Sequence, residues 1–318
     1  MLPSCPPAPS PLFLPLAFFY SVLYVASLYI FVPASTRALP RSDPRQIRAR
    51  LAAALSTTAL SLLSFLLLFC PSLAYLGLPP AAFTSLLPPK PLLHVVSLYL
   101  GPLTLLLLSP LHLLSHPPFH GHSFPSYRAA LAHVLTVYKG LPPTLNLSLW
   151  PPAKLRDLVL GPLTEELCYR SLLLPLLLAS GFSPRAAVGI SPLFFGFAHV
   201  HHGYRSYRGG LPLQQALLQA AFQFAYTSLF GLYCSYALLA SGSVLGPFLA
   251  HSFCNFAGLP DLSYLSPLSR EHKYRHVISA AYVLGIAMFA YGFRLMGGWE
   301  PAPAYRELIA AAEAGALS

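Results

Sequence analysis

Long apolar runs, separated by short segments rich in proline, arginine or histidine, set the pattern of this chain. A helix needs ~20 predominantly apolar residues to cross a bilayer. Residues 209–260 contain no charged side chain and are long enough for two such helices, divided near Ser241-Gly242-Ser243. The pattern predicts an all-α, polytopic integral membrane bundle of about eight transmembrane helices. The predicted spans lie within residues 11–32, 51–76, 91–114, 158–180, 184–200, 209–260 (two spans) and 277–296.

Local signals give the expected helix ends. Pro162 suits a first turn, Gly181 suits a helix C-terminus, and Ser183-Pro184 restarts the chain. Residues 204–208 are expected to form a basic loop, and the polar tail after residue 296 has a helical pattern. Residues 128–147 are interrupted by charged side chains and are either an interfacial helix or a ninth span. We expect one membrane domain over residues 1–318, with its functional core at about 155–260.

Composition supports a membrane protein and gives its orientation. Only 9% of the 318 residues are charged, against about 25% in soluble proteins. Five arginines lie between Arg37 and Arg50 in what we expect to be a short loop, and the positive-inside rule places this loop in the cytosol and the N-terminus in the lumen. A signal peptide is the alternative for residues 11–32, but no basic residue precedes that run. The net charge of +10 indicates attraction to anionic lipids, and no soluble basic domain is present to bind nucleic acid.

The segment Gly161-Pro-Leu-Thr-Glu-Glu-Leu-Cys-Tyr-Arg170 concentrates charge in an otherwise nearly acid-free region. A carboxylate inside the membrane costs at least ~2.5 kcal/mol, so it marks a functional site. Glu166 and Arg170 have the i, i+4 spacing of a helical ion pair. Glu165 points about 100° away from Glu166 and is left to face another direction.

Three more polar residues lie on other predicted spans. His199 follows an aromatic-rich run, and His251 and Asn255 share one helix face at i and i+4. Converging at a bundle centre, these residues form a hydrolytic set with Glu165. One carboxylate and one histidine activate water, while one histidine and one amide stabilise an oxyanion.

Each of these residues also has a simpler interpretation. In this interpretation, the Glu166–Arg170 pair would be a structural ion pair. Alternatively, Arg170 would bind a substrate carboxylate. His251 and Asn255 form interhelical hydrogen bonds, and a histidine at a span end is interfacial. Cys168 is an alternative nucleophile, although no histidine lies at a suitable spacing. A zinc site would use Glu165 with the histidines His199, His201, His202 and His251; without an HExxH pattern we expect no metal and no other cofactor.

The three motifs, Glu165-Glu166-xxx-Arg170, Phe195-xxx-His199 and His251-xxx-Asn255, together resemble the CAAX prenyl proteases of the Ras-converting-enzyme type. Their local contexts are similar to those of the eukaryotic members. The resemblance implies an eight-helix intramembrane protease of the endoplasmic reticulum membrane, with its active site reached from the cytosolic side. It implies removal of the last three residues from farnesylated or geranylgeranylated CAAX proteins, such as Ras-like small GTPases.

The resemblance also implies roles for the motif residues. Glu165 and His199 would activate water, His251 and Asn255 would form the oxyanion hole, and Glu166 and Arg170 would support the site without a metal. Three other functions remain open from the residues alone. They are an ion-coupled transporter using the Glu-Arg-His cluster, a non-catalytic membrane scaffold, and a protease of the same fold with unprenylated substrates.

Overall fold

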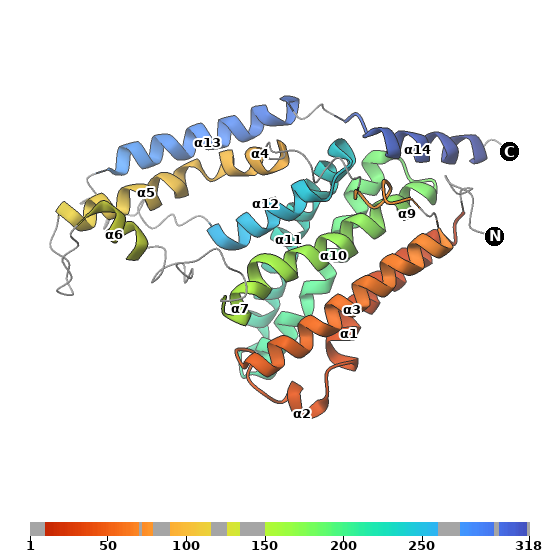
Figure 1. The fold of residues 1–318 in the computed structure, drawn as a ribbon, viewed down its shortest axis with the longest axis horizontal. Coiled ribbons are helices and arrows are strands. Elements are labelled where there is room, and N and C mark those ends of the chain that lie inside the picture. The colour runs from red at the N-terminus through yellow and green to blue at the C-terminus, as the bar shows by residue number, and fades with distance from the viewer. Residues whose placement is uncertain are drawn as a thin grey trace. The chain divides into compact units, whose positions relative to one another are not determined.

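The computed structural model describes residues 10–69, 72–78, 90–115, 126–133, 150–259, 274–295 and 299–316. All regular elements in these ranges are helices, and no strand occurs in them, so the all-α prediction is confirmed for the described residues. Figure 1 shows the helices in chain order. The elements are α1 Phe13–Ile30, α2 Ala34–Arg37, α3 Pro44–Leu68, α4 Lys90–Leu98, α5 Leu100–Ser115, α6 Tyr127–His133, α7 Pro152–Leu155, η4 Arg156–Leu160, α8 Gly161–Glu166, η5 Leu167–Leu172, α9 Leu173–Ala179, α10 Pro184–Arg208, α11 Leu213–Ser241, α12 Leu245–Ala257, α13 Arg275–Leu295 and α14 Pro303–Ala316.

The helices group into two compact units. The first unit comprises residues 1–87, 160–249 and 297–318, and the second comprises residues 88–159 and 250–296. The single membrane domain expected from the sequence stays a prediction.

Three described helices, α1, α3 and α13, are long and apolar enough to cross a membrane. The pair α4 and α5 is bent by 67° and makes a fourth candidate if it forms one span. The chain is therefore helical with three to four candidate spans among its described residues, and eight spans are not confirmed. Helices α10 and α11 are as long, but they are not among the helices apolar enough to be candidate spans. Helix α12 has only 13 residues, less than the ~20 that a span requires.

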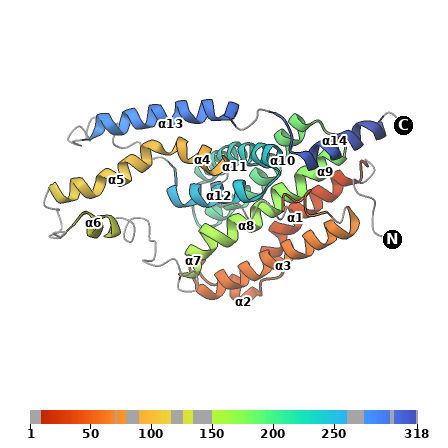
Figure 2. The ribbon, with the colours of Figure 1, turned by 45° about the horizontal axis from the view of Figure 1, so that its top comes forward.

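Helices α10 and α11 of the first unit lie side by side and antiparallel (Figures 1 and 2). Small residues form their seam: the Cα atoms of Gly196 and Gly203 face α11 so closely that a Cβ atom at either position would clash. The hydroxyls of Ser191 and Ser235 form a 2.7 Å hydrogen bond across it. Close approach at small residues, with hydrogen bonds between helices, is typical of helix pairs in membranes.

The Glu165-containing helix begins earlier than expected. A continuous helical run extends from Pro152 to Ala179, and two π-helical segments, η4 and η5, flank α8 within it. Pro162 therefore does not start the run, as the sequence suggested, but follows the first π segment, where its missing N–H disrupts no regular α-helical ladder. Gly181 ends the run with φ +89°, and the N–H of Phe182 donates to the carbonyl of Leu177, which confirms the expected helix C-terminus.

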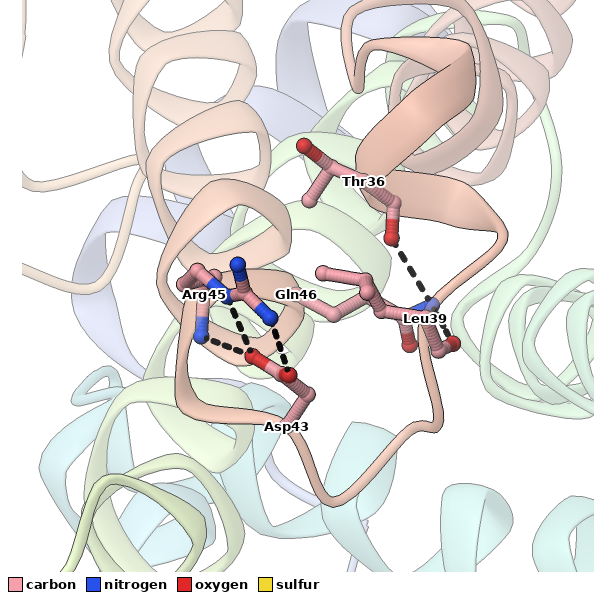
Figure 3. A network of polar contacts seen from close by, with 5 residues as sticks. All are labelled: Thr36, Leu39, Asp43, Arg45 and Gln46. Carbon is pink, nitrogen blue, oxygen red and sulfur yellow. Dashed lines mark hydrogen bonds and ion pairs between the residues drawn. The ribbon is translucent and has the colours of Figure 1, made fainter.

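The arginine-rich segment is largely helical rather than a loop, because α3 already begins at Pro44. Asp43 caps this helix by accepting the N–H of Arg45 at 2.8 Å and pairing with its guanidinium (Figure 3). These hydrogen bonds hold the pKa of Asp43 below its usual range. The buried Gln46 donates to the carbonyls of Thr36 and Leu39, and so ties the preceding turn to α3.

In the second unit, α13 packs antiparallel against α4 and α5. The buried His94 donates Nε2–H to the carbonyl of Phe289 at 2.6 Å and stacks on its ring. Gly285 and Gly292 permit this close packing, because a Cβ at either position would meet α4 or its end within 3 Å.

Other expectations have mixed outcomes. The predicted basic loop at residues 204–208 is wrong: α10 continues to Arg208, because Arg205 and Arg208 in its last turn favour the negative end of the helix dipole. The division near residue 242 is confirmed, since Gly242 ends α11 in the left-handed conformation. The last span and the helical tail correspond to α13 and α14. Most of residues 128–147 lies outside the described residues.

Candidate functional site

The centre of the candidate site is a buried ion pair. Arg170 Nη1 lies 3.2 Å from Glu166 Oε1, and both side chains are 0% exposed. The i, i+4 pairing predicted from the sequence is therefore confirmed. Because a buried charge is costly unless it is paired, each of these residues compensates the other and holds it in place.

Phe195 links this pair to His199. The Arg170 guanidinium lies 4.2 Å from the centre of the Phe195 ring, and that ring is 4.5 Å from the His199 ring. Phe195 is itself buried and also packs against Tyr169. An ion pair on one helical run is thus connected through one aromatic ring to the histidine on α10.

His199 has a defined tautomer. Its Nδ1 lies 2.8 Å from the carbonyl oxygen of Phe195. A carbonyl can only accept, so Nδ1 carries a proton, and Nε2 is the nitrogen that can take or give one in a reaction. The side chain is partly exposed, so this nitrogen is not sealed in the core.

Glu165 differs from its neighbour in burial and in surroundings. Glu165 is partly exposed, whereas Glu166 is fully buried. The Glu165 carboxylate interacts electrostatically with the hydroxyls of Tyr24 on α1 and Tyr226 on α11. Tyr24 is in turn hydrogen-bonded to Thr164 at 2.9 Å. Glu165 therefore faces a second environment, in which its carboxylate is partly exposed.

His251 and Asn255 lie on α12 in the second unit. His251 is buried and Asn255 is exposed. One N–H of the Asn255 amide donates to the backbone carbonyl of Asp157 at 2.8 Å. This bond orients the amide and leaves its second N–H for another acceptor.

The structure thus links Glu166 and Arg170 to His199 through Phe195 in the first unit, which also contains Glu165. His251 and Asn255 belong to the second unit. The bridging position of Phe195 was missed, although its i−4 spacing from His199 was the available signal. The π segments on both sides of α8 were also missed. Such segments are frequent at functional sites, and apart from Pro162 nothing in the sequence pattern indicates them.

Two alternative chemistries find no support in the described residues. Cys168 is 2% exposed and its thiol points to the carbonyl of Tyr20, so a substrate cannot reach the sulfur. In the described ranges, no three histidine, cysteine, aspartate or glutamate side chains are grouped so that they could hold a metal ion.

Several known proteins are similar to this chain. Residues 147–257 match the family described as type II CAAX prenyl endopeptidase Rce1-like. A probable CAAX prenyl protease 2 of Schizosaccharomyces pombe is 32% identical over 251 residues, which are 78% of this chain and 81% of the relative. CAAX prenyl protease 2 of Homo sapiens is 34% identical over 275 residues, 84% of this chain and 75% of the relative. The protein of that name in Rattus norvegicus is 30% identical over 84% of this chain and 73% of the relative. No solved structure matches the chain.

Proposed function

Because this chain belongs to the CAAX prenyl protease 2 family, we propose that it is an intramembrane endopeptidase that removes the last three residues from prenylated CAAX proteins. The observation that carries the mechanism is the buried Glu166–Arg170 pair, which packs through Phe195 against His199. This arrangement supports a water-activating site beside the pair.

Glu165 is the general base in this proposal. Glu166 is 0% exposed and paired with Arg170, so it cannot meet water. Glu165 is partly exposed and is not in that pair. A carboxylate in an apolar surrounding is suited to take a proton from water.

His199 shares the work of activating water through Nε2. The carbonyl of Phe195 holds its Nδ1–H, in the way that a fixed acceptor orients a catalytic imidazole. His251 and Asn255 are proposed to stabilise the oxyanion that forms when water attacks the scissile carbonyl. The reaction needs no metal: water supplies the nucleophile, and the released tripeptide takes the proton on its new amine.

The proposed substrates are farnesylated or geranylgeranylated CAAX proteins, including Ras-like small GTPases. An isoprenyl chain is stabilised by ~0.8 kcal/mol for each CH₂-sized unit buried in an apolar environment. The candidate spans indicate a multi-pass membrane protein that also contacts lipids. We place it in the endoplasmic reticulum membrane with its site open to the cytosol, where CAAX proteins are located.

The test is release of the C-terminal tripeptide by the purified, detergent-solubilised full chain. A farnesylated CAAX peptide and the same peptide without the prenyl group are compared, each with and without a chelator. We expect cleavage of the farnesylated peptide alone, unchanged by the chelator. Equal cleavage of both peptides would indicate a protease for unprenylated substrates, and no cleavage by folded protein would favour a transporter or a scaffold.

A further inference from the structure

Arg50 is a half-buried cation in the first unit, in the second turn of α3. Its guanidinium lies 5.4 Å from the centre of the Tyr29 ring on α1. Its Nε is buried and has no hydrogen-bond partner among the described residues. The start of α3 is fixed by the Asp43 cap and by Gln46, so the helix presents Arg50 at a defined place.

Arg50 is connected to His199 by a row of aromatic rings. The Tyr29 ring lies 5.9 Å from the ring of His201, and the His201 ring lies 4.0 Å from that of His202. The His202 ring is 5.8 Å from the His199 ring. Arg50 also interacts electrostatically with both His201 and His202. Tyr29, His201 and His202 therefore connect the guanidinium to the proposed catalytic histidine.

Within the described part of the chain, no acidic side chain forms an ion pair with this cation. The ion pairs within the described ranges join Asp43 to Arg45, Asp157 to Arg156 and Glu166 to Arg170, and none includes Arg50. Arg170, considered from the sequence as a carboxylate clamp, cannot reach a substrate because it is 0% exposed and paired. Among the five arginines of residues 37–50, Arg50 is the one in contact with Tyr29.

The substrate of the proposed reaction supplies the missing anion. The leaving tripeptide ends in a free carboxylate, and three extended residues span at most ~11 Å. A guanidinium fork binds a carboxylate through two parallel hydrogen bonds, and an aromatic face stabilises the cation without using its N–H groups.

We propose that Arg50, held against Tyr29, binds the C-terminal carboxylate of the CAAX substrate and so sets the cut three residues from the end. The proposal rests on the proposed function. It also explains why a cation is kept half-buried near a row of histidines, although the histidines have no favourable electrostatic interaction with a positive neighbour.

The experiment compares two farnesylated CAAX peptides of the same sequence, one ending in a free carboxylate and one in a carboxamide. The full chain is reconstituted in phosphatidylcholine vesicles, with and without phosphatidylserine. Wild type, Arg50→Gln, Arg50→Lys and Arg48→Gln are assayed for tripeptide release. Arg48→Gln is the matched control. Arg48 is an exposed residue on the same helix, and its substitution removes the same charge as Arg50→Gln.

Wild type is expected to prefer the free acid by about 10- to 100-fold in kcat/KM, the range of a hydrogen bond between charged groups. Arg50→Gln should remove that preference by slowing cleavage of the acid peptide. Its kcat/KM for the amide peptide should stay within about twofold of the wild-type value. Arg50→Lys should retain part of the preference, because it keeps the charge without the fork. Arg48→Gln should behave as wild type.

Three results would overturn the proposal. Equal cleavage of the acid and the amide peptide by wild type would show that the protein does not recognise the C-terminal carboxylate. Arg50→Gln that slows both peptides equally shows a structural role. A loss seen in phosphatidylserine vesicles alone, regardless of the terminus, assigns Arg50 to an anionic lipid headgroup. Cleavage of neither peptide by wild type would instead contradict the proposed function itself.

Discussion

At the scale of single residues, two adjacent glutamates have opposite surroundings. Glu166 is buried in the first unit with Arg170, whereas Glu165 is partly exposed. Burial of an ion pair contributes little net stability, because desolvation offsets the attraction, but removing one partner leaves an uncompensated charge. The pair is therefore best understood as fixing the position of Arg170 under the Phe195 ring.

Glu166→Gln should lower the free energy of unfolding by about 3–5 kcal/mol, because it leaves Arg170 charged and buried. The double variant Glu166→Gln/Arg170→Met should recover most of that loss, since no charge then remains in the core. Unfolding in detergent, followed for both variants and wild type, measures the difference. Arg45→Gln, which breaks the exposed pair with Asp43, is the control and should have little effect. A double variant as unstable as the single one would refute this account of the pair.

The i, i+4 ion pair could be predicted because both residues lie on one helix, where spacing alone sets the contact. The position of Phe195 between Arg170 and His199 could not, because it depends on how two helices cross. The same reason limited the prediction for Arg170: the sequence left a substrate clamp open, and only packing around the side chain excludes it.

At the scale of helices, the contact between α10 and α11 positions the buried arginine. A Cβ added to Gly231 on α11 would lie 2.9 Å from Pro192 Cβ and 3.0 Å from Arg170 Nη2. Glycine at this position leaves the space that the guanidinium occupies. The helix pair therefore supports the site directly, in addition to packing the first unit.

Gly231→Ala is expected to reduce tripeptide release at least about tenfold and to destabilise the protein by about 1–3 kcal/mol, because the methyl group displaces Arg170 or Pro192. Gly189→Ala is the matched control on α10, where no atom lies within 4 Å of the added Cβ. It should be neutral or stabilise the helix by up to about 1 kcal/mol. Activity and unfolding are measured on both variants; equal behaviour would show that Gly231 does not make room for Arg170.

Helix boundaries illustrate where sequence reasoning succeeds. Local chemistry gave the Gly181 and Gly242 ends and the Ser183-Pro184 start, all of which the structure confirms. It did not give the π segments or the full length of α10, because these depend on packing along the run. Charged residues at 205 and 208 suggested a loop, although they equally suit a helix C-terminus.

At the scale of the molecule, the motifs lie within the part of the chain that matches its family, residues 147–257. The proposed catalytic residues, Glu165 and His199, belong to the first unit. The proposed oxyanion residues, His251 and Asn255, belong to the second. The number of spans was the least predictable feature. Apolar composition indicates membrane helices, but polar residues such as the histidines of α10, which carries the proposed catalytic His199, lower the apolarity of a helix.

The most direct measurement of the central claim is the rate of tripeptide release by Glu165→Gln, in the purified full chain with a farnesylated CAAX peptide. Glutamine keeps the size of the side chain and removes the base, so we predict a loss of about 10²- to 10⁴-fold in kcat with unchanged unfolding. Glu313→Gln, an exposed change of the same kind on α14, should retain full activity. A folded Glu165→Gln protein that cleaves at the wild-type rate would contradict the claim that Glu165 activates the water.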